Sequence, residues 1–133
     1  MKSTLQTWLR LLLSAFFITM GTLHFAAAEP FIAIVPSVLP FPRELVYLSG
    51  LGEILGGLGI LPVATRQWAG FGLIALLIAV FPANINQALN NIPIQGRAIS
   101  PLVLWARLPL QFVLMAWVWW CTLSGKPMSQ YKS

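Results

Sequence analysis

The segment LVLWARLPLQFVLMAWVWWCTL, residues 102–123, contains a single charged residue, Arg107, among its 22 positions. A helix needs roughly 20 mainly apolar residues to cross the hydrocarbon core of a bilayer, so this segment predicts a transmembrane helix. Three further apolar runs of similar length lie earlier in the chain, at residues 11–28, 45–63 and 68–85. With their flanking residues, the four runs predict helices at about residues 5–28, 44–63, 67–91 and 101–124.

The composition supports a membrane protein and excludes other classes. Of the 133 residues, 58% are hydrophobic and 8% are charged, and the mean hydropathy is +0.80. A soluble domain is about a quarter charged. The net charge of +5 comes from scattered side chains rather than from a basic run, which argues against nucleic-acid binding. We therefore predict one all-α domain, residues 1–133, folded as an integral membrane four-helix bundle.

Few side chains of the sequence are suited to redox or metal chemistry. A single cysteine, Cys121, excludes a disulfide framework, a CxxC pair and a cysteine-based metal site. A single histidine, His24, excludes the bis-histidine ligation of a transmembrane haem. We therefore predict no metal site and no cofactor of the chain's own. Any electron chemistry requires a bound molecule, such as a quinone or another lipid, or a partner protein.

The connection between the first two apolar runs is rich in proline. Residues 29–44 are mostly apolar but contain Pro30, Pro36, Pro40 and Pro42. Proline removes a backbone donor and breaks a helix interior, so this connection cannot form one continuous helix. We expect a re-entrant or interfacial segment that covers the bundle. The next connection, residues 64–67, is expected to be a tight turn.

The positive charges predict the orientation of the chain in the membrane. With the N-terminus inside, the cytoplasmic side holds Lys2, Arg10, Arg66, Lys126 and Lys132, and the outer loops hold Arg43 and Arg97. The positive-inside rule then predicts that both termini are cytoplasmic. We expect the protein to be integral to the plasma (inner) membrane.

A competing interpretation is a signal peptide that is cleaved after three small residues, Ala26 to Ala28. The apolar stretch of 18 residues is longer than the usual 7–15 of a signal peptide. We therefore expect the first helix to be retained.

Five polar side chains from the four runs fall at similar depth: His24, Glu53, Asn84, Arg107 and Gln111. At a rise of about 1.5 Å per residue, all five lie in the outer half of the bilayer. A charge at mid-membrane costs about 3 kcal/mol on insertion scales, so we predict that Glu53 and Arg107 pair. The five residues then form either a ligand-binding site or a purely structural buried ion pair with hydrogen-bonded neighbours.

Glycines surround Glu53 in the second run. Gly52 and Gly56 form a GxxxG motif, which permits close packing of helices. The alternative is that the same glycines leave room for a flat ligand beside Glu53.

Four short motifs resemble the DoxX-like family of small four-helix integral membrane proteins. They are Gly21-x-x-His24-Phe25, Ser49-Gly50-x-x-Glu53-Ile54-x-Gly56-Gly57, Phe81-Pro82-Ala83-Asn84-Ile85 and Arg107-Leu108-Pro109-x-Gln111. The name of that family derives from a subunit linked to a quinol oxidase and a thiosulfate:quinone oxidoreductase. The resemblance therefore implies an accessory or binding subunit of quinone-linked membrane redox chemistry, with a membrane redox enzyme as its partner.

The family supplies no catalytic residues to carry over, so we expect no catalytic activity of the chain's own. The alternative is a non-enzymatic membrane chaperone, assembly factor or small-solute carrier in which the ion pair is purely structural.

Overall fold

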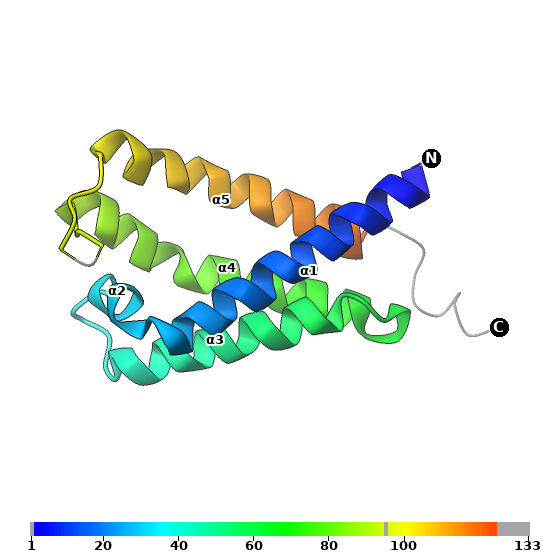
Figure 1. Ribbon diagram of the computed structural model, residues 1–133, viewed down its shortest axis with the longest axis horizontal. Coiled ribbons are helices and arrows are strands. Elements are labelled where there is room, and N and C mark those ends of the chain that lie inside the picture. Colours follow the sequence, from blue (N-terminus) through cyan, green and yellow to red (C-terminus); the bar gives the residue numbers. More distant parts are fainter. Residues whose placement is uncertain (1, 95, 125–133) are drawn as a thin grey trace.

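The computed structural model describes residues 2–94 and 96–124, with side chains from residue 4 onward. The elements are α1 (Lys2–Ala26), α2 (Ala28–Ala33), α3 (Pro42–Gly59), α4 (Val63–Asn90) and α5 (Pro101–Thr122) (Figure 1). Over these described ranges no strand forms, although Ile94 and Arg97 make an isolated antiparallel bridge in the α4–α5 loop. The prediction of an all-α fold is confirmed for this part of the chain. Lys126 and Lys132, which contributed to the predicted orientation, lie outside it.

Three of the helices are long and apolar enough to cross a membrane, by length and composition. They are α1 from Thr4 to Ala26, α4 and α5. The 18 residues of α3 include Arg43, Glu44 and Glu53, and charged residues make a helix a poorer candidate for spanning. The fold is therefore compatible with a membrane protein.

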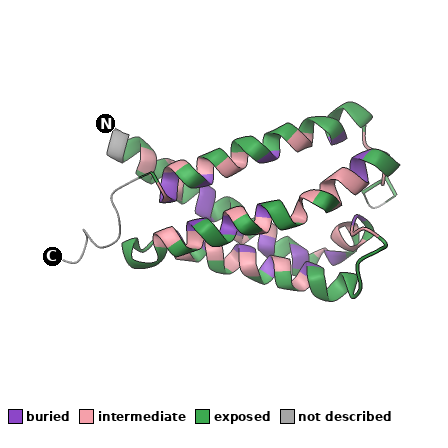
Figure 2. Cartoon of the chain, turned by 180° about the vertical axis from the view of Figure 1, so that it is seen from behind, coloured by how far each residue is buried: buried purple, intermediate pink, exposed green. Residues whose placement is uncertain are grey.

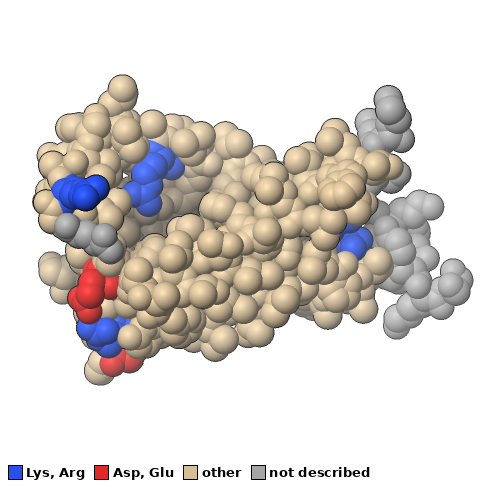
Figure 3. All heavy atoms as spheres, in the orientation of Figure 1, with Lys and Arg blue, Asp and Glu red and all other residues tan. Residues whose placement is uncertain are grey.

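The outward faces of the helices are apolar. Trp68 is 72% exposed, Leu102 is 79% exposed and Phe112 is 57% exposed. Surface apolar side chains gathered in this way mark contact with something other than water. In the space-filling view the visible charged side chains gather towards the two ends of the molecule, and a wide band between them carries none (Figure 3). Such a band suits the hydrocarbon core of a bilayer.

The turn between α3 and α4 is shorter than predicted, because α4 begins at Val63 and residues 64–67 are helical. The predicted turn at these residues is therefore wrong. The first turn of α4 holds the end of α3: the Thr65 hydroxyl donates to Gly59 O at 2.6 Å, and Arg66 donates to Ile60 O at 2.9 Å. These bonds satisfy carbonyls that a helix end leaves without a partner, so the chain needs few connecting residues.

The long helices pack in the order α1, α3, α4 and α5. The buried side chains of the core cluster lie in the half of the molecule nearer the termini: Leu13, Phe17, Ile60, Leu73, Leu77, Val118 and Cys121. Buried residues follow the inward faces of the helices (Figure 2). The core therefore holds one end of the molecule together and leaves the other end less filled.

Two hydrogen bonds join α1 to α5 near the start of α1 and the end of α5. The Gln6 side chain donates to Trp120 O at 2.6 Å, and Arg10 Nε donates to Cys121 O at 3.0 Å. Towards the end where α2 lies, α1 and α5 diverge (Figures 1 and 2). The molecule is therefore closed at one end and wider at the other.

Helices α1 and α3 approach closely at glycines. A Cβ atom on Gly21 would lie 2.5 Å from Gly50 O, and one on Gly50 would lie 2.6 Å from His24 Cβ. A Cβ on Gly57 would meet Ser14 O at 3.0 Å, and the Ser14 hydroxyl donates to Gly57 O at 2.6 Å. Such close backbone approach is possible because glycine has no Cβ.

The two glycines of the predicted GxxxG motif face α4 instead. A Cβ on Gly56 would clash with the Leu73 side chain, whereas one on Gly52 would lie 3.4 Å from Leu76 Cδ2, an ordinary contact. Close packing against α4 therefore depends on Gly56 rather than on Gly52.

The proline-rich connection folds over the wide end of the molecule. It begins with the short helix α2 and ends at Phe41, whose φ of 55° is left-handed, just before Pro42 starts α3. Arg43 and Glu29 form an exposed ion pair at 2.7 Å between the two ends of the connection. Asn86 Nδ2 donates to Ile34 O at 2.9 Å, which ties the segment to α4.

Candidate functional site

A cavity of about 490 Å³ lies between α1, α2 and α3 on one side and α4 and α5 on the other. Its apolar lining includes Phe16, Phe17, Met20, Phe31, Ile34, Val35, Leu39, Leu45, Val46, Leu76, Leu77, Val80, Leu110 and Leu114. Its polar lining consists of His24, Ser49, Glu53, Asn84, Arg107 and Gln111. All five polar residues predicted from the sequence therefore reach one cavity.

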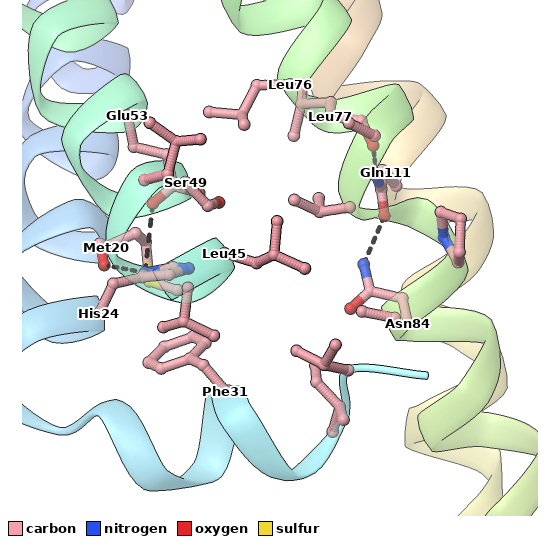
Figure 4. Close-up of a pocket in the computed structure, with 18 of the residues that line it drawn as sticks. Met20, His24, Phe31, Leu45, Ser49, Glu53, Leu76, Leu77, Asn84 and Gln111 are labelled. Carbon is pink, nitrogen blue, oxygen red and sulfur yellow. Dashed lines mark hydrogen bonds and ion pairs between the residues drawn. The ribbon is translucent and has the colours of Figure 1, made fainter. Parts of the chain in front are cut away.

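The polar side chains lie on two facing walls (Figure 4). His24, Ser49 and Glu53 come from α1 and α3, and Asn84 and Gln111 come from α4 and α5. Because Phe16 and Phe17 precede His24 by about two turns, the polar layer has an apolar floor towards the core. The α2 segment covers its other side with Phe31 and Ile34.

His24 and Glu53 are neighbours on the first wall. His24 Nδ1 lies 2.7 Å from Met20 O and 3.4 Å from Glu53 Oε2. The imidazole stacks on the ring of Phe31, with centroids 3.9 Å apart and an interplanar angle of 19°. Gly21 and Gly50 bring α1 close enough to α3 for this contact. The glycines of the helix interface thus position the first wall.

Two oxygens of the first wall are buried without a hydrogen-bond partner among the described residues: Glu53 Oε2 and Ser49 Oγ. The 3.4 Å approach of His24 Nδ1 to Glu53 Oε2 is within ion-pair distance but makes no hydrogen bond. The Glu53 side chain is 10% exposed. A buried polar atom without a partner costs about 1–3 kcal/mol, so a ligand that donates to these oxygens would be stabilised here.

The second wall is a network of side-chain amides around Arg107. Arg107 Nη1 donates to Gln87 Oε1 at 2.7 Å, and Nη2 donates to Asn84 Oδ1 at 3.4 Å. Asn84 Nδ2 donates to Gln111 Oε1 at 2.5 Å, and Gln111 Nε2 in turn donates to Leu77 O. Gln111 therefore fixes the orientation of the Asn84 amide. Asn84 in turn helps to orient the Arg107 guanidinium.

The predicted ion pair between Glu53 and Arg107 is wrong. Within the described residues, the basic side chain within 4.0 Å of Glu53 is the imidazole of His24, and the partners of Arg107 are neutral amides. The physical reason is helix adjacency: Glu53 lies on α3, which packs against α1 and α4, whereas Arg107 lies on α5, which packs against α4. The two charges face the same cavity from different walls.

Sequence reasoning missed three side chains of the site: Ser49, Gln87 and Phe31. Ser49 precedes Glu53 by four residues and Gln87 follows Asn84 by three, so both share a helix face with a predicted residue. That spacing could have identified them. Phe31 lies in the proline-rich connection, where no periodicity indicates which side chains face inward.

The site has the features of a binding cavity for an amphipathic molecule. Most ligand cavities are apolar with a few placed polar groups, and here those groups form one layer inside an apolar lining. Among the described residues, no group of three His, Cys, Asp or Glu side chains is placed to hold a metal ion.

The family model described as Domain of unknown function (DUF8561) matches residues 13–122, which is more than half of the chain and includes every cavity-lining residue. No curated protein and no solved structure matches the chain. The chain therefore belongs to the DUF8561 family.

Proposed function

We propose that this protein is an accessory or binding protein of the plasma (inner) membrane that holds a membrane-dissolved amphipathic molecule in its cavity. The observation that carries the proposal is the cavity itself: it joins an apolar lining to a single layer of polar side chains. A polar headgroup fits the layer, and an alkyl or isoprenoid tail fits the apolar lining. On this proposal the protein has no catalytic activity of its own.

The proposal includes the membrane arrangement. We propose that α3 crosses the bilayer together with α1, α4 and α5 as a four-helix bundle, although its three charged residues make it a poorer candidate by composition than the other three. The proline-rich connection with α2 then lies at the outer interface, and both termini lie in the cytoplasm. The close packing of α1 on α3 supports this, because it places Glu53 beside His24 rather than against lipid.

A quinone is the candidate ligand that the resemblance to DoxX-like proteins favours. A quinone carbonyl accepts hydrogen bonds, and the Arg107 guanidinium has five N–H donors, more than it gives to Gln87 and Asn84. Electrons would then pass to and from a partner redox enzyme in the membrane. Another lipid with a hydrogen-bonding headgroup would use the same groups.

The experiment is native mass spectrometry of the protein purified in detergent, with organic extraction of what travels with it. We expect a bound lipid or quinone in the wild type and its loss in Ala79→Phe, which fills the cavity from α4. The matched control is Ile78→Phe, because Ile78 is 57% exposed and does not line the cavity. Equal ligand content in the two variants, or none in the wild type, would contradict the proposal. The second outcome would favour a membrane chaperone, an assembly factor or a carrier.

A further inference from the structure

Among the described residues, Arg107 has no acidic partner. The chain has three acidic residues, and the described structure accounts for all of them. Glu29 pairs with Arg43, Glu53 lies beside His24, and Glu44 is exposed in the first turn of α3. Within the described residues no carboxylate lies within 4.0 Å of the Arg107 guanidinium, so none of the acidic side chains neutralises its charge.

The amides around Arg107 fix its position without cancelling its charge. Gln87 and Asn84 both present a carbonyl oxygen to the guanidinium. Their amide nitrogens are engaged elsewhere: Asn84 Nδ2 donates to Gln111, and Gln87 Nε2 donates to Ile92 O at 3.3 Å. The network therefore holds a guanidinium of fixed orientation at the wall of the cavity.

A guanidinium has five N–H donors, and two of the guanidinium nitrogens donate to these amides. Arginine binds phosphate and carboxylate groups with charge-assisted, often bidentate hydrogen bonds, which are about twice as strong as neutral ones. A charge at membrane depth is also costly when it has no counter-charge. An anion in the cavity would satisfy both the remaining donors and the charge.

The opposite wall of the cavity favours a ligand that donates hydrogen bonds. Glu53 Oε2 and Ser49 Oγ are buried, line the cavity and have no hydrogen-bond partner among the described residues. These oxygens accept hydrogen bonds, so they match hydroxyl groups on a ligand. The two walls together are complementary to a headgroup that carries both an anion and a hydroxyl.

We propose that the cavity binds an anionic lipid, with its phosphate group on Arg107 and a hydroxylated part of the headgroup on Glu53 and Ser49. This inference rests on the proposed function and narrows it to one ligand class. The source is a lipid rather than a free anion, because apolar side chains such as Leu76, Leu110 and Leu114 line the rest of the cavity. Phosphatidylglycerol has the required groups and serves as the probe.

The test compares the binding of four probes to delipidated protein in detergent, by native mass spectrometry. They are phosphatidylglycerol, diacylglycerol with the same acyl chains, ubiquinone, and glycerol phosphate as the headgroup without a tail. We expect the wild type to bind phosphatidylglycerol at least about tenfold more tightly than diacylglycerol, as one charge-assisted contact implies. Glycerol phosphate alone should bind far more weakly, and equally tight binding would overturn the lipid assignment.

The matched variants are Arg107→Gln and Arg97→Gln. Arg97 is an exposed arginine in the α4–α5 loop and does not line the cavity. We expect Arg107→Gln to lose the preference for phosphatidylglycerol and Arg97→Gln to keep it. If Arg107→Gln does not fold, Arg107→Lys replaces it in the test, together with the preference of the wild type for phosphatidylglycerol over diacylglycerol. Lysine retains the charge, so we expect Arg107→Lys to keep part of that preference.

The outcomes separate this inference from the proposed function. Ubiquinone or diacylglycerol bound as tightly as phosphatidylglycerol would overturn the inference and leave a lipid-binding cavity. The same holds if Arg107→Gln keeps the wild-type preference. Binding of none of the lipid probes would overturn both.

Discussion

The ring of Phe31 stacks on the imidazole of His24, with centroids 3.9 Å apart and planes 19° from parallel. Phe31 belongs to the short helix α2, and His24 belongs to the last turn of α1. The stacking therefore fixes the segment that covers the cavity to the wall that carries Glu53. The stacking therefore links the position of α2 to that of the polar side chains in the cavity.

We predict that Phe31→Ala lowers the thermal stability of the protein in detergent and speeds ligand release. An aromatic pair contributes about 0.5–1.5 kcal/mol beyond the area that it buries, so a measurable loss is expected. The control is Phe41→Ala, because Phe41 lies in the same connection and is 70% exposed. Similar losses of stability in the two variants would show that the stacking has no special role.

The glycine contact between α1 and α3 gives a second prediction. A Cβ on Gly50 would lie 2.6 Å from His24 Cβ and 2.8 Å from Gly21 O, so Gly50→Ala forces the two helices apart. Overpacking of this kind costs about 1–3 kcal/mol, which thermal unfolding in detergent would detect.

The control for this variant is Gly72→Ala on α4. No atom lies within 4 Å of a Cβ at Gly72, and alanine is favoured over glycine in a helix interior. We therefore expect Gly72→Ala to be neutral or slightly stabilising. A larger loss in Gly72→Ala than in Gly50→Ala would argue against the α1–α3 contact.

A double-mutant cycle tests which charges interact. We predict that His24→Gln and Glu53→Gln are coupled, because the two side chains approach to 3.4 Å. Coupling between residues in contact is about 0.5–3 kcal/mol. The same cycle on Glu53→Gln and Arg107→Gln should give additive losses of stability, because no contact within 4.0 Å joins these residues in the described structure. Equal coupling in both cycles would mean that the charges interact across the cavity.

Labelling of single cysteines in intact cells tests the proposed orientation. In a Cys121→Ala background, Ala98→Cys in the α4–α5 loop should react with a membrane-impermeant reagent. Ala64→Cys at the start of α4 should react only after the cells are opened. Both positions are exposed, so access to the side chain itself is comparable. The reverse pattern of labelling would place both termini outside.

The depth of polar residues could be read from the sequence, but their partners could not. Helical rise places His24, Glu53, Asn84, Arg107 and Gln111 in one layer, and all five line the cavity. Depth does not determine which helices are neighbours. The pairing of Glu53 with His24 depends on the approach of α1 to α3 at Gly21 and Gly50.

The neutral hydrogen-bond partners of Arg107 could not be predicted from the sequence either. We expected a carboxylate for Arg107 because opposite charges attract most strongly, yet the guanidinium donates to the amides of Gln87 and Asn84. A search for counter-charges overlooks such amides. The prediction of a turn at residues 64–67 was wrong for a similar reason. The hydrogen bonds from Thr65 and Arg66 to the end of α3 form only in the folded chain, so the sequence pattern does not show them.

Helices α1 and α5 are joined by hydrogen bonds at one end only, so the distance between them at the other end depends on the angle between the two helices. The two hydrogen bonds are at Gln6 and Arg10, and Arg107 lies about 21 Å along α5 from Cys121 at 1.5 Å per residue. A rotation of α5 by about 5° at the fastened end would therefore shift the Arg107 end by about 2 Å over that length. A change in the α1–α5 contact at the closed end, such as the loss of these hydrogen bonds, would therefore alter the width of the cavity at Arg107.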